Sequence, residues 1–296
     1  MKIFQILISI HNDWESLNIL LSKIFSSNKN SGCKFNILII DDYSSEKNNK
    51  NLSSVFDNEI EILRNEKNIG HGRSIAKGVK YLKKNKQFDF LIVMDGDGED
   101  RPEEIPELVN RSLNNPDKTI TANRVKRSEG LFFKFLYECH KILVFLFIGK
   151  SIKFGNYVSI PYSHLSLIFD KNDLPVSFSG TIEKYIFNKD SINSFRGLRY
   201  QGLTKMSFLK LILHSFRIIS VFKFNFFFRS LVFSSAIGIL LFFFPYTFFN
   251  YLFIFTIIVA IILNLIFFNI FHYYSSLNLY SFNNRNFRQK ACINFR

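Results

Sequence analysis

The amino-acid sequence predicts an α/β domain with a mostly parallel sheet, followed by amphipathic helices and a hairpin of two membrane-spanning helices. Two observations lead to this prediction. The first part of the chain alternates apolar runs of strand length with segments whose apolar residues recur at helical spacing. The 37 Phe are unevenly distributed, with 16 in residues 1–204 and 21 in residues 205–296. A mixed, charged front therefore precedes an aromatic, apolar back.

Strands and helices alternate along the front. Residues 3–10 form an apolar strand, and Leu17, Leu20, Leu21 and Ile24 mark the apolar face of a helix at 14–25. Near-continuous apolar strands between helices are typical of a parallel sheet that is covered on both faces. Further strands are expected at 35–40, 59–63 and 88–94, and further helices at 72–83 and from Pro102, where Asp100 and Glu103 can form a capping box.

The back contains two runs without a charged residue, 230–249 and 251–271. Each is about 20 residues long, enough to cross the hydrocarbon core of a bilayer as a helix. The turn between them has no Lys or Arg, whereas basic residues flank both runs, so the positive-inside rule places both flanks and the front domain in the cytoplasm. The sequence thus predicts an integral protein of the cytoplasmic membrane. Two buried helices of a soluble domain are the alternative.

These patterns divide the chain into four parts. Residues 1–204 form the front domain, in which an apolar stretch with scattered charges at 131–149 suits a helix in the membrane interface. An amphipathic juxtamembrane segment at 205–229 leads into the transmembrane hairpin at 230–271. A basic cytoplasmic tail occupies 272–296.

Charge and cysteine content narrow the function classes. There are 38 Lys and Arg against 24 Asp and Glu, a formal net charge of +14, which favours nucleic acid, phosphorylated ligands or a membrane surface as partner. No nucleic-acid-binding module is found, so we expect no nucleic-acid partner. Three widely spaced cysteines, Cys33, Cys139 and Cys292, exclude a disulfide scaffold.

The strongest chemical signal is the acidic loop at residues 95–100, Asp-Gly-Asp-Gly-Glu-Asp, which follows the strand predicted at 88–94. Alternating carboxylates at a strand end can present hard oxygen ligands to Mg²⁺ or Mn²⁺. A metal ion held there can also bind a diphosphate. An EF-hand loop does not fit, because its sixth and twelfth positions are Asp100 and Pro106 instead of Gly and Glu. A solvated acidic turn is the alternative.

Polar residues also follow the first two strands, at 9–13 and at Asp41-Asp42. In a parallel sheet these turns and the acidic loop meet at one edge, where such sheets bind ligands. This convergence predicts a site for a nucleotide diphosphate. Residues 68–73 do not match the dinucleotide fingerprint, because Ile75 stands where the pattern needs Gly. His71 and Arg73 can still lie near phosphates.

With these motifs in place, the chain resembles family 2 glycosyltransferases of the GT-A fold. It is most similar to membrane-anchored polyprenyl-phosphate glycosyltransferases and to dolichol-phosphate mannose synthase. The resemblance covers about residues 3–225, and five motifs in order carry it. They are residues 8–13, similar to I-P-x-Y-N-E, residues 40–45, similar to V-D-D-G-S-T, residues 68–78, similar to N-x-G-x-x-x-A-x-x-x-G, the D-x-D segment at 94–103, and residues 199–206, similar to R-x-x-G-x-S-K-M.

The resemblance implies inverting, metal-dependent transfer of a sugar from a nucleotide-diphosphate sugar to a polyprenyl phosphate. It implies that Asp95 and Asp97 hold a divalent metal, with Glu99 close by. The residues implied at the nucleotide are Ser9, His11, Asp13, Asp42, Gly70, Arg73 and Asp95. The residues implied in catalysis are Asp97 and Glu99, together with Arg124, Arg127, Arg199 and Lys205, which would cradle phosphates of the donor or acceptor.

Several positions depart from the family pattern. Ser9, His11, Asp13 and Tyr43 replace the usual Pro, Tyr, Glu and Gly, which leaves the identity of the nucleotide open. A second hypothesis keeps the transferase but uses a hydroxyl of a lipid-linked glycan or glycolipid as acceptor, with Glu183 as the acidic residue to test as base. A third is a membrane-anchored nucleotide-binding scaffold without activity. A homo-oligomer is compatible with all three.

Overall fold

A computed structural model describes residues 1–28, 31–45, 60–126, 142, 145–146, 148–202, 208–242 and 248–281. The expected succession of strands and helices in the front is confirmed. The elements in chain order are β1 (Ile3–Ile10), α1 (Trp14–Asn28), β2 (Lys34–Asp41), β3 (Ile60–Arg64), α2 (His71–Asn85), β4 (Phe90–Asp95), η2 (Pro102–Glu104), α3 (Ile105–Asn114), β5 (Thr119–Lys126), β6 (Phe154–Pro161), α5 (Tyr162–Ile168), α6 (Phe178–Tyr185), β7 (Lys189–Phe195), α7 (Phe208–Val221), α8 (Lys223–Phe242) and α9 (Phe248–Ser281).

In the described part of the chain, seven strands form one sheet in the order β3-β2-β1-β4-β6-β5-β7. Strands β3, β2, β1 and β4 are parallel to one another, and β5 is parallel to β7. Only β6 runs antiparallel to its two neighbours, β4 and β5. The predicted α/β fold with a mostly parallel sheet is therefore confirmed, although the sequence patterns identified none of the last three strands.

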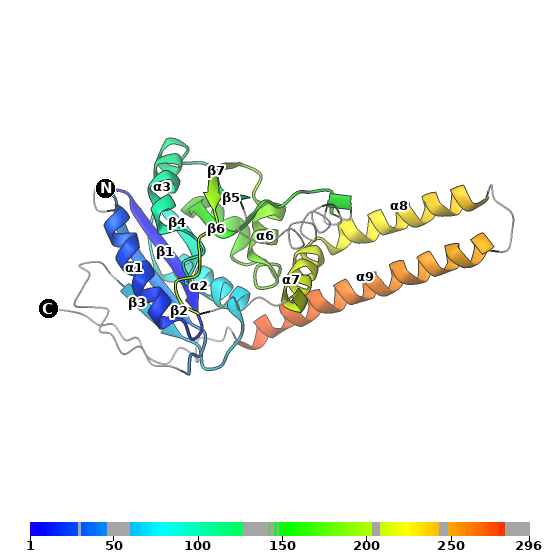
Figure 1. Ribbon diagram of the computed structural model, residues 1–296, viewed down its shortest axis with the longest axis horizontal. Coiled ribbons are helices and arrows are strands. Elements are labelled where there is room, and N and C mark those ends of the chain that lie inside the picture. Colours follow the sequence, from blue (N-terminus) through cyan, green and yellow to red (C-terminus); the bar gives the residue numbers. More distant parts are fainter. Residues whose placement is uncertain are drawn as a thin grey trace.

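Helices cover both faces of the sheet (Figure 1). Side chains of β1 alternate between the two faces, so Phe4, Ile6 and Ile8 pack with α1 and α3, whereas Leu7 packs with α2, α5 and α6. All four are fully buried, and each such side chain contributes about 1.5–3 kcal/mol relative to an exposed one. The two apolar layers hold the strand ends, and with them the predicted ligand edge, in fixed positions.

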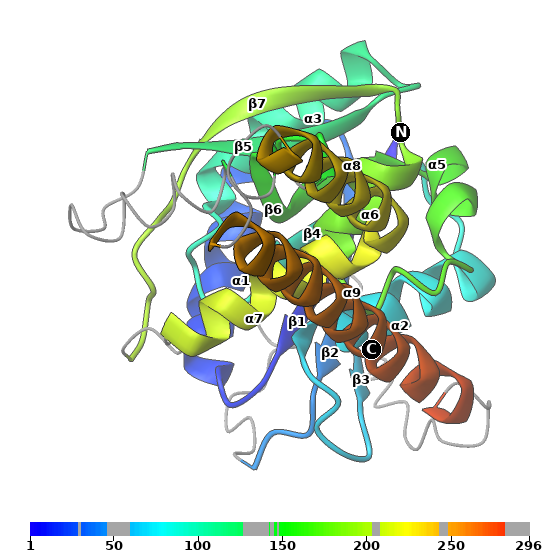
Figure 2. The same cartoon turned by 90° about the vertical axis from the view of Figure 1, so that its right-hand side faces the viewer.

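The back of the chain forms a helical arm. Helices α8 and α9 lie side by side and extend away from the sheet domain (Figures 1 and 2). Among the described helices, only α9 is by itself long and apolar enough to cross a membrane, over Tyr251–Tyr273 with a mean hydropathy of 2.8 and 6% of its most apolar stretch buried. The described part of α8 meets that criterion only as a bent pair with α7, over Ile212–Val221 and Lys223–Ile237.

The described part of the amphipathic segment predicted at 205–229 comprises helix α7 and the start of helix α8. Helices α7 and α8 meet at an angle of 92°, and Phe222 at this corner is buried against Val176 of the front domain and Phe267 of α9. The described residues do not include most of the interfacial helix predicted at 131–149. They also do not include residues 282–296 of the predicted tail. In the predicted interfacial helix, Phe145 is exposed, and Ile148 is buried in the apolar cluster that also contains Phe222.

Candidate functional site

The carboxyl ends of β1, β2 and β4 lie at one edge of the sheet, as the sequence predicts. The strand register pairs Ser9 with Asp95 and Ile10 with Asp41. This edge brings together the turns after the three strands, since neighbouring parallel strands end at the same level. The polar residues from three separate parts of the sequence therefore share one site.

The turns after β1 and β2 are bonded to each other. The Asn12 backbone N–H donates to Oγ of Ser44 at 2.9 Å, and its side-chain oxygen accepts from the N–H of Ser45 at 2.8 Å. Nδ1 of His11 lies 2.9 Å from the carbonyl oxygen of Asp42. Asn12 and Tyr43 have φ angles of 52° and 62°, the left-handed region that tight turns require. The two turns thus form one rigid wall of the site.

Asp42 is 2% exposed, and its carboxylate is directed at the backbone of the loop before α2. It accepts hydrogen bonds from the N–H groups of Ile69 at 2.8 Å and Gly70 at 2.7 Å, and from the side-chain amide of Asn65 at 2.9 Å. Gly70 has a φ of 89°, which a side chain would strain. In this structure Asp42 positions the loop that leads to His71.

Each carboxylate of the acidic loop, Asp95–Asp100, lies beside a cationic side chain from another part of the chain. Asp95 is paired with His71 of α2, and Asp100 with Arg124 of β5. Asp97 and Glu99 are paired with arginines from the segment after β7. These two pairs are Asp97 with Arg199 and Glu99 with Arg196. The loop therefore combines four negative charges with four groups that carry or can carry positive charge.

Asp95 is the most constrained member of the loop. Its Oδ1 lies 3.0 Å from Nε2 of His71 and accepts a hydrogen bond from Nδ2 of Asn156 at 3.1 Å. Burial opposes ionisation of both groups, but their mutual attraction outweighs it. The pKa of His71 is raised and the pKa of Asp95 is held well below its usual range. This corner of the site therefore holds an ion pair.

The next carboxylates behave in the opposite way. Burial, with the charges of Asp95 and Glu99, raises the pKa of Asp97 to about 6. Burial and the charge of Asp95 raise the pKa of Asp100 to about 7. Like charges at close range disfavour simultaneous ionisation. The loop is therefore poised to bind additional positive charge near neutral pH.

Asp100 also corrects one expectation. The predicted capping box with Glu103 is wrong, because no side chain caps the turn that begins at Pro102. Instead, Oδ2 of Asp100 accepts from the backbone N–H of Asp95 at 3.0 Å, and Oδ1 lies 3.5 Å from Nη2 of Arg124. Asp100 is 3% exposed. Asp100 therefore stabilises the acidic loop from its buried side. The spacing of residues in the sequence does not reveal this role.

The segment 196–202, which we term the strap, lies against the acidic loop. The backbone N–H of Gly197 donates to the carbonyl of Glu99 at 2.8 Å, and that of Tyr200 donates to the carbonyl of Asp97 at 3.0 Å. Nη1 of Arg199 donates to Oδ2 of Asp97 at 2.9 Å, and Nη2 of the same guanidinium is bonded to Asp13. Arg199 therefore links the turn after β1 to the acidic loop after β4.

Three other basic residues that the sequence predicts at the site are not seen at the acidic loop. Arg73 donates to the carbonyl of Ile69 at 3.1 Å, and its guanidinium carbon lies 5.5 Å from the ring of Tyr273 in α9. Arg127 and Lys205 fall outside the described residues. Sequence reasoning missed Asn156 and Arg196. Nothing local marks Asn156, whereas Arg196 is a further cation three residues before Arg199 and could have been included.

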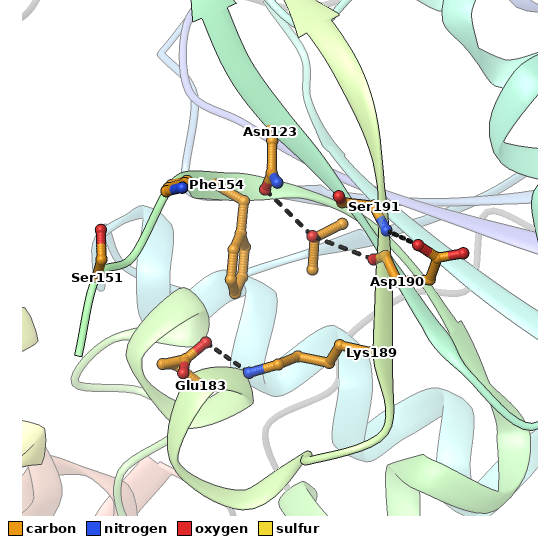
Figure 3. A pocket seen from close by; sticks show the side chains of 9 residues that line it. Asn123, Ser151, Phe154, Glu183, Lys189, Asp190 and Ser191 are labelled. Carbon is orange, nitrogen blue, oxygen red and sulfur yellow. Dashed lines mark hydrogen bonds and ion pairs between the residues drawn. The ribbon is translucent and has the colours of Figure 1, made fainter.

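Glu183 belongs to a separate pocket of about 270 Å³, shown in Figure 3. Its carboxylate points at Nζ of Lys189, and Lys150 lies 3.7 Å away on the other oxygen. The pocket is also lined by Asn123, Phe154 and Asp190, and by no residue of the acidic loop. Both oxygens of Glu183 are thus engaged by ammonium groups in a pocket apart from the acidic loop, so this geometry does not favour Glu183 as the base of a hydroxyl-dependent reaction.

The acidic loop supplies the kind of donor that a hard divalent ion needs. Carboxylate oxygens of Asp95, Asp97 and Glu99 suit Mg²⁺ or Mn²⁺. Within the described part of the chain, however, no three Asp, Glu, His or Cys side chains are already arranged around one point. Arg199 and Arg196 are bonded to two of the carboxylates. The residue types fit such an ion, and Oδ2 of Asp97 already accepts a hydrogen bond from Arg199.

The fold and the site define an α/β protein in which an acidic loop lies at the carboxyl edge of a mostly parallel sheet, at the end of the central strand. The chain belongs to glycosyl transferase family 2, whose model matches residues 5–173. The family resemblance inferred from the five motifs is thereby confirmed.

Curated relatives carry one recurring name. The chain is 25% identical over 217 residues to the undecaprenyl-phosphate 4-deoxy-4-formamido-L-arabinose transferase of Pectobacterium carotovorum, covering 71% of this chain and 64% of that protein. It is 30% identical over 161 residues to the protein of that name from Yersinia enterocolitica, covering 53% of this chain and 46% of that protein. The chain therefore spans about half to two thirds of the length of these relatives.

Solved structures support the fold. Glucosyl-3-phosphoglycerate synthase of Mycobacterium tuberculosis, in complex with Mn²⁺, UDP-glucose and phosphoglyceric acid, superimposes with a TM-score of 0.52 at 12% identity, covering 76% of this chain and 79% of that chain. Staphylococcus aureus TarS 1-349 in complex with UDP-GlcNAc gives 0.51 at 12% identity, covering 79% and 71%. At this identity the similarity concerns the fold alone.

Proposed function

We propose that this protein transfers a sugar, with inversion, from a nucleotide-diphosphate sugar to a polyprenyl phosphate at a membrane surface. The observation that carries the proposal is the acidic loop at the carboxyl edge of the sheet, surrounded by the cations His71, Arg124, Arg196 and Arg199. Such a mixture suits a reaction in which both reactants are phosphate anions. The names of the relatives, which are transferases acting on undecaprenyl phosphate, support the choice of acceptor.

The donor would bind across the ends of β1, β2 and β4. Ser9 lies near the end of β1, His11 and Asp13 lie in the turn after it, and Asp42 fixes Gly70 at the start of α2. Arg73 lies one turn into that helix. A nucleotide held by these turns would place its diphosphate toward Asp95, where the acidic loop begins. The UDP-sugars in complexes of structural neighbours support a nucleotide donor.

The same loop would bind a divalent ion through Asp95 and Asp97, with Glu99 nearby. When bound, such an ion neutralises charge that develops on the departing nucleotide diphosphate. The Mn²⁺ in the complex of a structural neighbour supports this part of the proposal. The pKa of about 6 at Asp97 means that its carboxyl is largely ionised, and so able to bind a cation, at neutral pH.

The acceptor requires little proton transfer because its phosphate is already ionised. One phosphate oxygen would attack the anomeric carbon while the bond from that carbon to the diphosphate breaks, releasing the nucleoside diphosphate. Two anions must approach each other, so cations are needed to offset their repulsion. Arg124 and Arg199 lie at the acidic loop, and we assign Arg127 and Lys205 to the same task.

The helical arm would anchor the protein in the membrane. Most of the apolar stretch of α9 is exposed, which in water would leave a large unfavourable surface. We propose that α8 and α9 enter the bilayer as a hairpin within 230–271, followed by a basic tail, with the front domain at 1–204 on the cytoplasmic side. The basic flanks and the uncharged turn support this orientation.

Transfer can be measured with membranes that contain the chain, polyprenyl phosphate, Mn²⁺ and labelled UDP- or GDP-sugars, followed by lipid extraction. We expect labelled lipid that disappears with EDTA. Asp97→Asn should lower transfer by about 100-fold, the scale for losing one preorganised electrostatic contact. Asp170→Asn, an exposed carboxylate beyond α5, is the control and should retain full activity. Full transfer by Asp97→Asn would exclude the proposed site.

A further inference from the structure

Arg199 occupies a position between the two halves of the site. Its three guanidinium nitrogens are all engaged, Nη1 by Asp97 at 2.9 Å, Nη2 by Asp13, and Nε by the carbonyl of Gln201 at 2.8 Å. Its side chain is 10% exposed. A long basic side chain at a protein surface normally extends into water. Here it points inward, to the carboxylate that the proposed function assigns to a divalent cation.

The strap holds Arg199 in this position from both sides. Gly197 and Tyr200 donate backbone hydrogen bonds to the carbonyls of Glu99 and Asp97. The ring of Tyr200 lies over Gly98, where a Cβ atom would come within 2.5 Å of it. Backbone and side-chain contacts both hold the strap against the acidic loop. The fold therefore directs the guanidinium of Arg199 at Asp97.

Arg199 and a divalent ion at Asp97 would be two cations beside one carboxylate, and each reduces the attraction that the carboxylate has for the other. Oδ2 of Asp97 accepts from Arg199, and Oδ1 accepts from the backbone N–H of Glu99 at 3.1 Å. A divalent ion bound to Asp97 would lie within a few ångströms of the guanidinium, and like charges at this range repel strongly. The two cations therefore compete at this carboxylate.

We propose that Arg199 acts as an internal cation that competes with a divalent metal ion for Asp97 in the free protein. This inference rests on the proposed function for the metal, and it adds that metal binding releases the Arg199 side chain. The released guanidinium is then available to a phosphate group at the same place. Asp13, its second partner, helps to retain Arg199 in the metal-free state.

Binding of Mn²⁺ alone tests the inference, with purified full-length protein in detergent and free Mn²⁺ followed by electron paramagnetic resonance. We expect Arg199→Gln to bind Mn²⁺ about tenfold more tightly than the wild type, the scale on which a neighbouring charge alters ionisation of a carboxylate. Arg101→Gln is the matched control. It removes one positive charge from a residue next to the loop whose side chain pairs with Glu103 at 3.8 Å and with no loop carboxylate. The affinity of the Arg101→Gln variant for Mn²⁺ should stay near that of the wild type.

Asp13→Asn provides a second variant if Arg199→Gln does not fold, as judged by circular dichroism. It leaves every carboxylate of the acidic loop intact and removes one of the anchors of Arg199, so it should also tighten Mn²⁺ binding, by a smaller factor. The inference is overturned if both variants bind Mn²⁺ no more tightly than Arg101→Gln. Sugar transfer is measured separately, so a protein without transfer but with these affinity changes would contradict the proposed function and leave this inference standing.

Discussion

Asn156 of β6 donates a hydrogen bond to Oδ1 of Asp95, the last residue of β4, at 3.1 Å. The same amide nitrogen lies 3.0 Å from Nε2 of His71, which contacts the same oxygen. Two elements distant in sequence, α2 and β6, thus hold the same carboxylate oxygen of Asp95. The geometry makes Asn156 a positioning residue for the acidic loop.

Replacing Asn156 tests this relationship. Asn156→Ala should lower kcat/KM for sugar transfer by about 10- to 100-fold, because a hydrogen bond to a charged group is worth about 1.5–3 kcal/mol. Steady-state kinetics with the nucleotide sugar varied would measure the change. Asn110→Ala, an exposed position on α3, serves as control. Equal kcat/KM values for the Asn156→Ala and Asn110→Ala variants would show that Asn156 has no positioning role.

The raised pKa of Asp100, about 7 with burial as the main cause, predicts how stability depends on pH. The folded state binds a proton at this carboxyl that the unfolded chain, with a pKa near 3.8, releases. Between about pH 4 and 7 the folded state therefore holds more protons, and stability falls as pH rises. Asp97, raised to about 6, acts in the same direction.

We expect Asp100→Asn to reduce this dependence, because asparagine can still accept from the Asp95 N–H but does not ionise. The difference in Tm between pH 5 and pH 8, measured by thermal unfolding in detergent, should shrink by about 2–4 °C for each kcal/mol of titration energy removed. The variant should be the more stable protein at pH 8. An unchanged difference would mean that Asp100 titrates normally.

Gly197 lies so close to the acidic loop that a Cβ atom would come within 2.7 Å of the carbonyl oxygen of Gly98. Gly197→Ala should therefore displace the strap and destabilise the protein by about 1–3 kcal/mol, as overpacking does. Gly72→Ala is the matched control. Its Cβ would meet only a backbone oxygen at 3.5 Å, so the helix α2 should be unchanged or slightly stabilised. Limited proteolysis of the strap would reveal the displacement, and equal resistance in both variants would contradict it.

Tyr273 connects the helical arm to the donor side of the site, because its ring lies 5.5 Å from the guanidinium carbon of Arg73. A contact of this kind contributes about 0.5–1 kcal/mol at an exposed position. Tyr273→Ala should raise KM for the nucleotide sugar by about two- to fivefold with little change in kcat. Tyr273→Phe keeps the aromatic face and should behave as the wild type. A raised KM for the nucleotide sugar in both variants would mean that the hydroxyl group of Tyr273, and not its aromatic face, makes the contribution.

Patterns within single segments were sufficient for the parallel half of the sheet. For the apolar runs ending at Ile10, Asp41 and Asp95, strand length and the polar turns that bound them favour strands over helices. Strands β5 to β7 contain Thr121, Asn123 and Ser191 among their apolar residues. Their pairing with one another, rather than their local composition, defines them as strands.

The sequence by itself determined the α/β class, the family, the acidic loop and the apolar arm, because these follow from local periodicity and from short motifs in a fixed order. Only the tertiary structure decided which partners the carboxylates have. His71, Arg124, Asn156, Arg196 and Arg199 come from four separate elements or connections, and no sequence spacing relates them to residues 95–100. Charge pairing depends on distance in space, and that distance is set by how the strap and helix α2 pack onto the sheet.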